Sequence, residues 1–163
     1  MSIETVRQFF RKYGIESRIL EFPVSSATVE LAAQALRCEP CRIAKTLSFS
    51  VQDTVVLVVA AGDARIDNAR FKKEFGVKAK MLSREEALER IGHNVGGVCP
   101  FAVKAGVRVF LDESLRRFST VFPACGSSNS AIELTISELE QYSESDAWVD
   151  VCKDWQASGE LHN

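Results

Sequence analysis

The stretch IAKTLSFSVQDTVVLVVAA, residues 43–61, decides the fold because it encodes two neighbouring strands. In residues 43–51 the side chains alternate. Leu47, Phe49 and Val51 share one side, and hydroxyl side chains occupy the other. A period of two residues with one apolar side is typical of a half-buried strand.

The second half of this stretch, residues 54–61, is a continuous apolar run. Such a run predicts a central strand that is covered on both faces of its sheet. Gln52 and Asp53 lie between the two segments and are suited to a tight turn.

Helical and strand signals alternate along the rest of the chain, and hairpin-length turns join several of the strands. Ser83 and Glu86 form a capping box, and Ser137 with Glu140 repeats that pattern. Helices are predicted over residues 2–13, from 26 or 28 to before 39, over 67–75, 83–92 and 113–118, and from 137. Further strands are predicted at residues 18–22, 77–82, 107–111, 120–124, 131–136 and 148–151. This pattern favours a mixed α+β sheet over a doubly wound parallel one.

Composition indicates one ordinary globular domain. The chain has 163 residues, of which 46% are hydrophobic and 26% charged, and we expect a domain over residues 1–155 with a polar tail at 156–163. No secretory signal is visible, and the longest apolar run, residues 55–62, is too short to span a bilayer. A cytoplasmic location is therefore expected, with free thiols at the five cysteines.

A formal net charge of −2 argues against an electrostatic coat for long duplex DNA. It leaves room for a local basic patch that grips one nucleic-acid end. One local cluster of basic residues is present in the sequence: Arg65, Arg70, Lys72, Lys73, Lys78 and Lys80. It is either such a patch or an ordinary solvent-exposed surface.

Lys45 is the most informative single position, because it extends the apolar side of the strand at 43–51. An ammonium on a buried face is costly unless it meets a partner or lines a cavity. Lys45 is therefore a candidate for binding a phosphate or carboxylate. The alternative is that the strand begins at Thr46 and that Lys45 extends into solvent.

The loop formed by Gly96, Gly97, Val98, Cys99 and Pro100 is the second candidate. Glycines allow backbone amides to approach a ligand, and such amides can stabilise a developing oxyanion. A plain connection between a helix and a strand is the alternative.

The cysteines offer weaker possibilities. Cys99 could be a nucleophile with His93 as its base, since the two residues are close in sequence. Cys38 and Cys41 form a CxxC pair, but the pair follows a helix C-terminus, where the dipole does not favour a thiolate. No further ligands at matching spacing indicate zinc, so chance spacing is the better explanation.

The sequence resembles the YbaK and prolyl-tRNA-synthetase-associated editing family over roughly residues 1–152. The segments that carry the resemblance are ATVE at 27–30, RIAKTLSF at 42–49, GGVCPF at 96–101, VRVFLDESL at 107–115, ACG at 124–126 and IELT at 132–135. The resemblance implies a mixed, barrel-like sheet of about six or seven strands surrounded by helices.

The resemblance also implies an enzyme that hydrolyses the ester between a wrong amino acid and the terminal adenosine of tRNA. Lys45 would hold the phosphate or ribose end of that adenosine, and backbone amides of residues 96–100 would stabilise the oxyanion. Water would be the nucleophile, with no metal or cofactor. Aligned with the family's pocket, the further substrate-binding residues would be Thr28, Phe101, Cys125, Gly126 and Ser127.

The family resemblance predicts a free-standing deacylase that acts in trans on tRNA mischarged with a small amino acid such as Ala, Cys or Ser. Its partners would be the mischarged tRNA acceptor end and a synthetase or elongation factor for delivery, with no membrane or DNA. A non-catalytic module that binds an aminoacyl-adenosine or a tRNA end is the alternative, followed by a cysteine hydrolase that uses Cys99. Sequence assigns no role to His93 and leaves the edited amino acid, the tRNA and the oligomeric state open.

Overall fold

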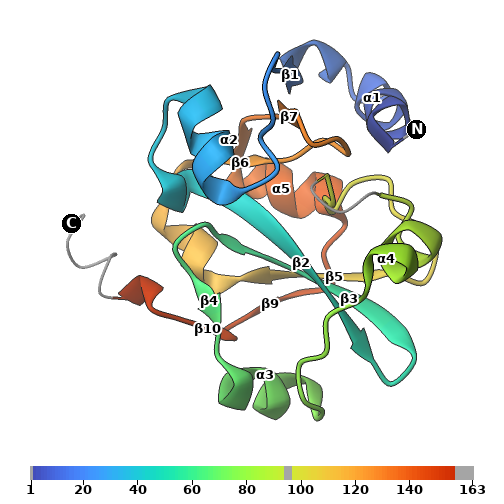
Figure 1. The fold of residues 1–163 in the computed structure, drawn as a ribbon, viewed down its shortest axis with the longest axis vertical. Coiled ribbons are helices and arrows are strands. Elements are labelled where there is room, and N and C mark those ends of the chain that lie inside the picture. The colour runs from blue at the N-terminus through green and yellow to red at the C-terminus, as the bar shows by residue number, and fades with distance from the viewer. Residues whose placement is uncertain (1, 94–96, 157–163) are drawn as a thin grey trace.

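The structure is a computed structural model that describes residues 2–93 and 97–156. Its centre is a six-stranded mixed sheet (Figure 1) with the strand order β8-β6-β2-β3-β5-β9. The strands are β2 (Ile43–Val51), β3 (Thr54–Ala61), β5 (Arg108–Asp112), β6 (Thr120–Pro123), β8 (Leu134–Thr135) and β9 (Ala147–Val149). The mixed α+β class predicted from the sequence is confirmed.

The β2–β3 hairpin is the longest pairing in the sheet, with a register that runs from Ala44 opposite Ala61 to Val51 opposite Thr54. Gln52 and Asp53 both have positive φ, 47° and 67°, as the two central residues of a tight hairpin turn require. Both strands and their turn therefore form where the sequence predicts them.

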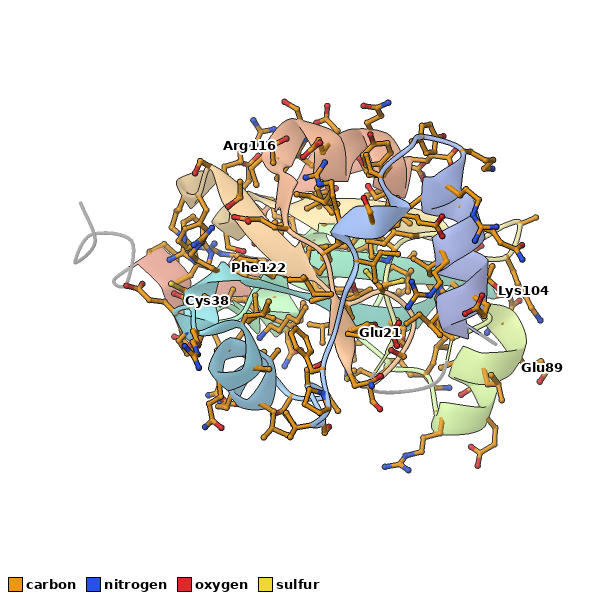
Figure 2. All side chains as sticks on the ribbon, turned by 90° about the horizontal axis from the view of Figure 1, so that it is seen from above. Glu21, Cys38, Glu89, Lys104, Arg116 and Phe122 are labelled. Carbon is orange, nitrogen blue, oxygen red and sulfur yellow. The ribbon has the colours of Figure 1, made fainter. Side chains whose placement is uncertain are left out.

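Five α-helices surround the sheet in the described part of the chain. They are α1 (Ser2–Arg11), α2 (Val29–Leu36), α3 (Asn68–Phe75), α4 (Arg84–Arg90) and α5 (Ile136–Ser143). Short 3₁₀ helices are η1 (Glu16–Arg18), η2 (Pro40–Arg42) and η3 (Glu113–Arg117). Figures 1 and 2 place α2 and α5 on opposite sides of the sheet, with α3 at one end.

Two small antiparallel pairings tie outlying segments to this core. β1 (Leu20–Glu21) pairs with β7 (Ser130–Ala131), and β4 (Arg65–Ile66) pairs with β10 (Cys152–Lys153). The first pairing, continued by the bond from Ser26 N–H to Ser128 O at 2.6 Å, brings the segment before α2 beside the turn before β7.

Three sequence predictions need correction. Residues 77–82 form no strand, because Met81 makes only an isolated bridge to Phe49. The predicted strand at 131–136 is broken into β7 and β8. The capping box of α5 is made by Thr135 and Glu138 instead of Ser137 and Glu140, so the helix begins earlier than the sequence pattern indicated.

A buried carboxylate links the end of β5 to the approach to β10. Asp112 has no exposed surface, and it accepts hydrogen bonds from Ser114 N–H at 2.9 Å and Val151 N–H at 3.0 Å. Both donors lose their partner if the carboxylate is removed, and a buried amide without a partner is costly.

We therefore expect Asp112→Ala to lower the free energy of unfolding by about 2–4 kcal/mol. Urea denaturation followed by circular dichroism measures this change. The matched control is Asp150→Ala, whose exposed carboxylate pairs with Arg70 and is expected to contribute less than about 1 kcal/mol. Equal losses in the two variants would show that Asp112 is not a structural anchor.

Candidate functional site

A hollow of about 370 Å³ opens between α2, strand β2, the segment leading into α4 and the β6–β7 region. Its walls are mainly apolar, with hydroxyls and two cationic side chains among them. The described residues that line it are Ser26, Ala27, Thr28, Val29, Ala32, Ile43, Ala44, Lys45, Thr46, Leu47, Ser48, Met81, Leu82, Arg84, Val98, Phe122, Ala124, Ser130 and Ala131. An apolar concave site with a few polar groups is typical of small-ligand binding.

The back of the hollow is built by a small apolar cluster between α2 and the sheet. Ala32 and Ala33 of α2 pack against Ile43 and Phe122. Figure 2 shows Phe122 and the neighbouring Cys38 beside α2, between the helix and the sheet. The small alanine side chains let the helix lie close to β2 without filling the hollow.

Lys45 of β2 is among the residues that line this hollow, and it is only partly exposed. Its ammonium donates to the carbonyl oxygens of Ala64 and Gly62, the latter at 3.4 Å. Burial lowers the pKa of Lys45, and the nearby charge of Asp63 acts in the opposite direction. The ammonium is thus held by the turn that follows β3, and the alternative in which it extends freely into solvent is not what the structure shows.

The glycine–proline loop borders the same hollow through Val98. Gly97 is buried against the turn at 126–127, where an added Cβ would lie 2.6 Å from Ser127 N and 2.8 Å from Gly126 C. Gly96 lies outside the described residues. Lys45 and the described part of the loop are therefore brought together, although they lie more than 50 residues apart in the sequence.

The other residues predicted to bind substrate lie at three kinds of place. Thr28 lines the hollow, and its hydroxyl also caps α2 by accepting from Leu31 N–H at 3.1 Å. Phe101 and Cys125 have no exposed surface and belong to the core, where Phe101 packs edge-on against Phe10. Gly126 and Ser127 support the loop from behind.

Cys99 and His93 do face each other, with Cys99 Sγ 3.6 Å from His93 Nε2. Neither is placed for nucleophilic chemistry. Cys99 has no exposed surface and is not among the described lining residues, and burial raises its pKa to about 12. His93 Nε2 lies 2.9 Å from Phe101 O, and burial lowers the pKa of its ring.

The structure also shows the state of the other cysteines and of the predicted basic cluster. All five cysteines are free thiols, and burial raises the pKa of Cys41 to about 11. In the described part of the chain, no group of three or more His, Cys, Asp or Glu side chains is arranged to hold a metal ion. The predicted basic cluster is exposed at every position, Arg65, Arg70, Lys72, Lys73, Lys78 and Lys80.

Comparison with known proteins identifies the family to which this chain belongs. Residues 24–142 match the aminoacyl-tRNA editing domain. The chain belongs to that family. The match includes Lys45, the loop and every residue that lines the hollow.

Relatives of this editing domain occur both alone and inside a larger enzyme. The chain is 55% identical over 157 residues to the uncharacterized protein YwhH of Bacillus subtilis (strain 168), covering 96% of this chain and all of that protein. It is 32% identical over 104 residues to the proline–tRNA ligase of Halalkalibacterium halodurans, covering 63% of this chain and 18% of the ligase.

A solved structure supports the fold of the editing domain. It belongs to a proposed trans-editing enzyme for prolyl-tRNA synthetase, which is 26% identical and superposes with a TM-score of 0.84. The superposition covers 93% of this chain and 97% of that one. No helix in the described ranges of this chain is long and apolar enough to cross a membrane.

Sequence reasoning missed several residues that shape the editing domain's hollow. Met81 lines it from the segment before α4 and Arg84 from the first position of α4, while Ala124, Ser130 and Ala131 line it from the β6–β7 region. No local pattern marks these positions, because their role depends on how distant segments pack. Ser26 could have been found through its position just before the helix-capping Thr28.

The close approach of Gly97 to the turn at 126–127 makes a direct prediction. Gly97→Ala is expected to lower the free energy of unfolding by about 1–3 kcal/mol, because its Cβ would overlap with backbone atoms. Thermal unfolding measures the loss. A Gly97→Ala variant as stable as the wild-type protein would contradict this packing.

Burial of Cys99 predicts its reactivity. In the native protein at pH 8, iodoacetamide should alkylate Cys38 at least about tenfold faster than Cys99, because the Cys99 thiol is inaccessible and protonated. Mass spectrometry of peptides at successive times gives both rates, with urea-unfolded protein as the control. Comparable alkylation rates of Cys38 and Cys99 in the native protein would show that the Cys99 thiol is accessible and can act as a nucleophile.

Proposed function

We propose that this chain is a free-standing deacylase that hydrolyses the ester of a tRNA mischarged with a small amino acid such as Ala, Cys or Ser. The observation that carries the proposal is the shared hollow: Lys45 and the loop residue Val98 border one cavity. Membership of the editing-domain family supports the same reaction class.

Lys45 is suited to hold the phosphate or ribose end of the terminal adenosine. Its ammonium keeps one proton beyond the two donated to Gly62 and Ala64. An ammonium in a partly buried site is costly to the fold, as its lowered pKa indicates. A charged side chain that is unfavourably buried beside a cavity is a candidate for a functional role.

The loop is suited to stabilise the oxyanion of the tetrahedral intermediate. Between described residues, no hydrogen bond uses the N–H of Gly97 or Val98. Preorganised amides of this kind favour charge that develops in the transition state, and their contribution is largest where water is excluded. The apolar walls beside Val98 provide such surroundings.

The proposed reaction needs no covalent enzyme intermediate. The oxygen of a water molecule forms a bond to the ester carbonyl carbon, and the bond from that carbon to the ribose oxygen breaks. The ribose oxygen leaves with a proton, which gives a free amino acid and an intact tRNA end. An aminoacyl ester is already activated, so positioning and oxyanion stabilisation supply the main rate enhancement.

The hollow would select amino acids by size. Its small and branched lining residues, including Ala32, Ala124 and Val98, leave room for short side chains. One methylene changes such selection by only about 1–3 kcal/mol, so several small amino acids are expected as substrates. The chain would act in trans in the cytoplasm, with a synthetase or elongation factor delivering the tRNA.

Deacylation of a panel of alanyl-, cysteinyl- and seryl-tRNAs tests the proposal. We expect at least one to be hydrolysed, and we expect Lys45→Ala to lower kcat/KM by on the order of 100-fold, because the contact to the adenosine end is lost. Release of labelled amino acid measures the rate. Lys12→Ala, which removes an exposed lysine outside both the hollow and the basic cluster, should retain the wild-type rate.

The outcomes separate the candidate functions. Full activity of Cys99→Ala would eliminate a cysteine hydrolase. Binding of a nonhydrolysable aminoacyl-adenosine without turnover of any tRNA in the panel would favour a binding module instead. Full activity of Lys45→Ala would contradict the proposed site.

A further inference from the structure

The two acceptors of Lys45 lie in one short turn. Gly62 and Ala64 flank Asp63 between β3 and β4, and the turn is closed by a bond from Ala64 N–H to Ala61 O at 3.0 Å. The place of the Lys45 ammonium is therefore set by the conformation of this turn. Contacts that fix the conformation of this turn therefore also fix the position of the Lys45 ammonium.

The Asp63 carboxylate is bound by Arg117 of η3. Arg117 NH2 donates to Asp63 Oδ1 at 2.6 Å, and NH1 donates to Oδ2 at 3.0 Å. Both side chains are largely buried, with 14% of Arg117 and 20% of Asp63 exposed. A bidentate pair of this kind has a fixed geometry, unlike an exposed ion pair.

The 3₁₀ helix η3 is itself firmly anchored. Arg117 Nε donates to Ser114 O at 2.9 Å, and its guanidinium lies over the rings of Phe118 and Trp155, 4.7 and 5.1 Å from their centroids. The hydroxyl of the buried Ser114 accepts from Ala61 N–H at 3.1 Å. η3 thus holds the turn at two points, before Gly62 and at Asp63.

We infer that Asp63 and Arg117 are positioning residues for Lys45, and that Arg117 also prevents the Asp63 carboxylate from pairing with the Lys45 ammonium in place of the substrate. This inference rests on the proposed function for its kinetic consequences. Neither residue is among the described residues that line the hollow, so both act through Lys45.

The second role follows from charge. Asp63 is close enough to Lys45 to affect its pKa, and Arg117 neutralises that carboxylate. Without Arg117, a partly buried carboxylate would remain beside a partly buried ammonium, and each would be the nearest partner for the other. The lysine would then be drawn away from the hollow.

The test is a double-mutant cycle on kcat/KM for deacylation, with thermal unfolding to verify that each variant is folded. Arg117→Ala should lower kcat/KM by on the order of 10- to 100-fold. Adding Asp63→Asn should restore about tenfold of that loss, because the competing charge is gone. Arg117→Lys keeps the charge without the fork and should fall between wild type and Arg117→Ala.

Arg116→Ala is the matched control on the same helix. Arg116 lies at the edge of the molecule (Figure 2), where it pairs with Glu113 and stacks on Trp148, and its loss should leave kcat/KM within about twofold. A double variant no more active than Arg117→Ala would overturn the inference, as would an equal loss in Arg116→Ala. If Arg117→Ala does not fold, Arg117→Gln, which also removes the charge, replaces it in the same comparison with and without Asp63→Asn.

A second measurement does not depend on catalysis. Lys45 can be labelled with an acylating reagent, and its rate followed by peptide mass spectrometry with Lys72 as internal reference. Labelling should be slower in Arg117→Ala than in wild type and should recover in the double variant. Unchanged labelling in Arg117→Ala overturns the inference, whereas a wild-type protein that deacylates no tRNA counts only against the proposed function.

Discussion

A partly buried ammonium on a strand face is the constraint from which the rest of the site follows. Lys45 lies on the central strand β2 beside an apolar hollow, and its charge is tolerated because two carbonyl oxygens accept hydrogen bonds from it. Burial lowers its pKa, so the fold gains little from its presence. The surrounding elements can be understood as the means of keeping this cation in place.

The central hairpin gives the lysine its direction, and the parts around it give it partners. β3 has almost no exposed surface, so β2 is held in one register, with Lys45 opposite Ala60. On one side, the turn after β3 supplies the acceptors. On the other, the contact between Gly97 and the turn at 126–127 sets the loop at the opposite rim. Two segments distant in sequence thereby meet across one hollow.

The sequence predicts those features that depend on local pattern. Strict alternation and a following apolar run identify β2 and β3 to the residue, and Asp67 with Gly76 bound α3 as helix cap and stop. The strand predicted at residues 77–82 is wrong because this segment lies beside β2 with only one bridge, between Met81 and Phe49. The periodicity of its side chains cannot distinguish such a segment from a fully paired strand. For α5, two overlapping capping boxes compete, and the earlier one forms.

For the site, the sequence predicts Lys45, Thr28 and the loop, but not how deeply its neighbours are buried. Phe101 and Cys125 adjoin the motif residues in sequence, yet both side chains are fully buried in the core. The partnership of Asp63 and Arg117 joins residues more than 50 positions apart, and nothing in either local segment indicates it. Such contacts depend on tertiary packing alone.

The proposed function requires that Lys45 and the loop amides contact one ligand together. Nuclear magnetic resonance of the protein, titrated with a nonhydrolysable alanyl-adenosine analogue bearing a 5′-phosphate, tests this most directly. If both groups contact the ligand, the Lys45 side-chain resonance and the Val98 amide resonance shift with a single common dissociation constant. Saturable binding that leaves either resonance unmoved would contradict it.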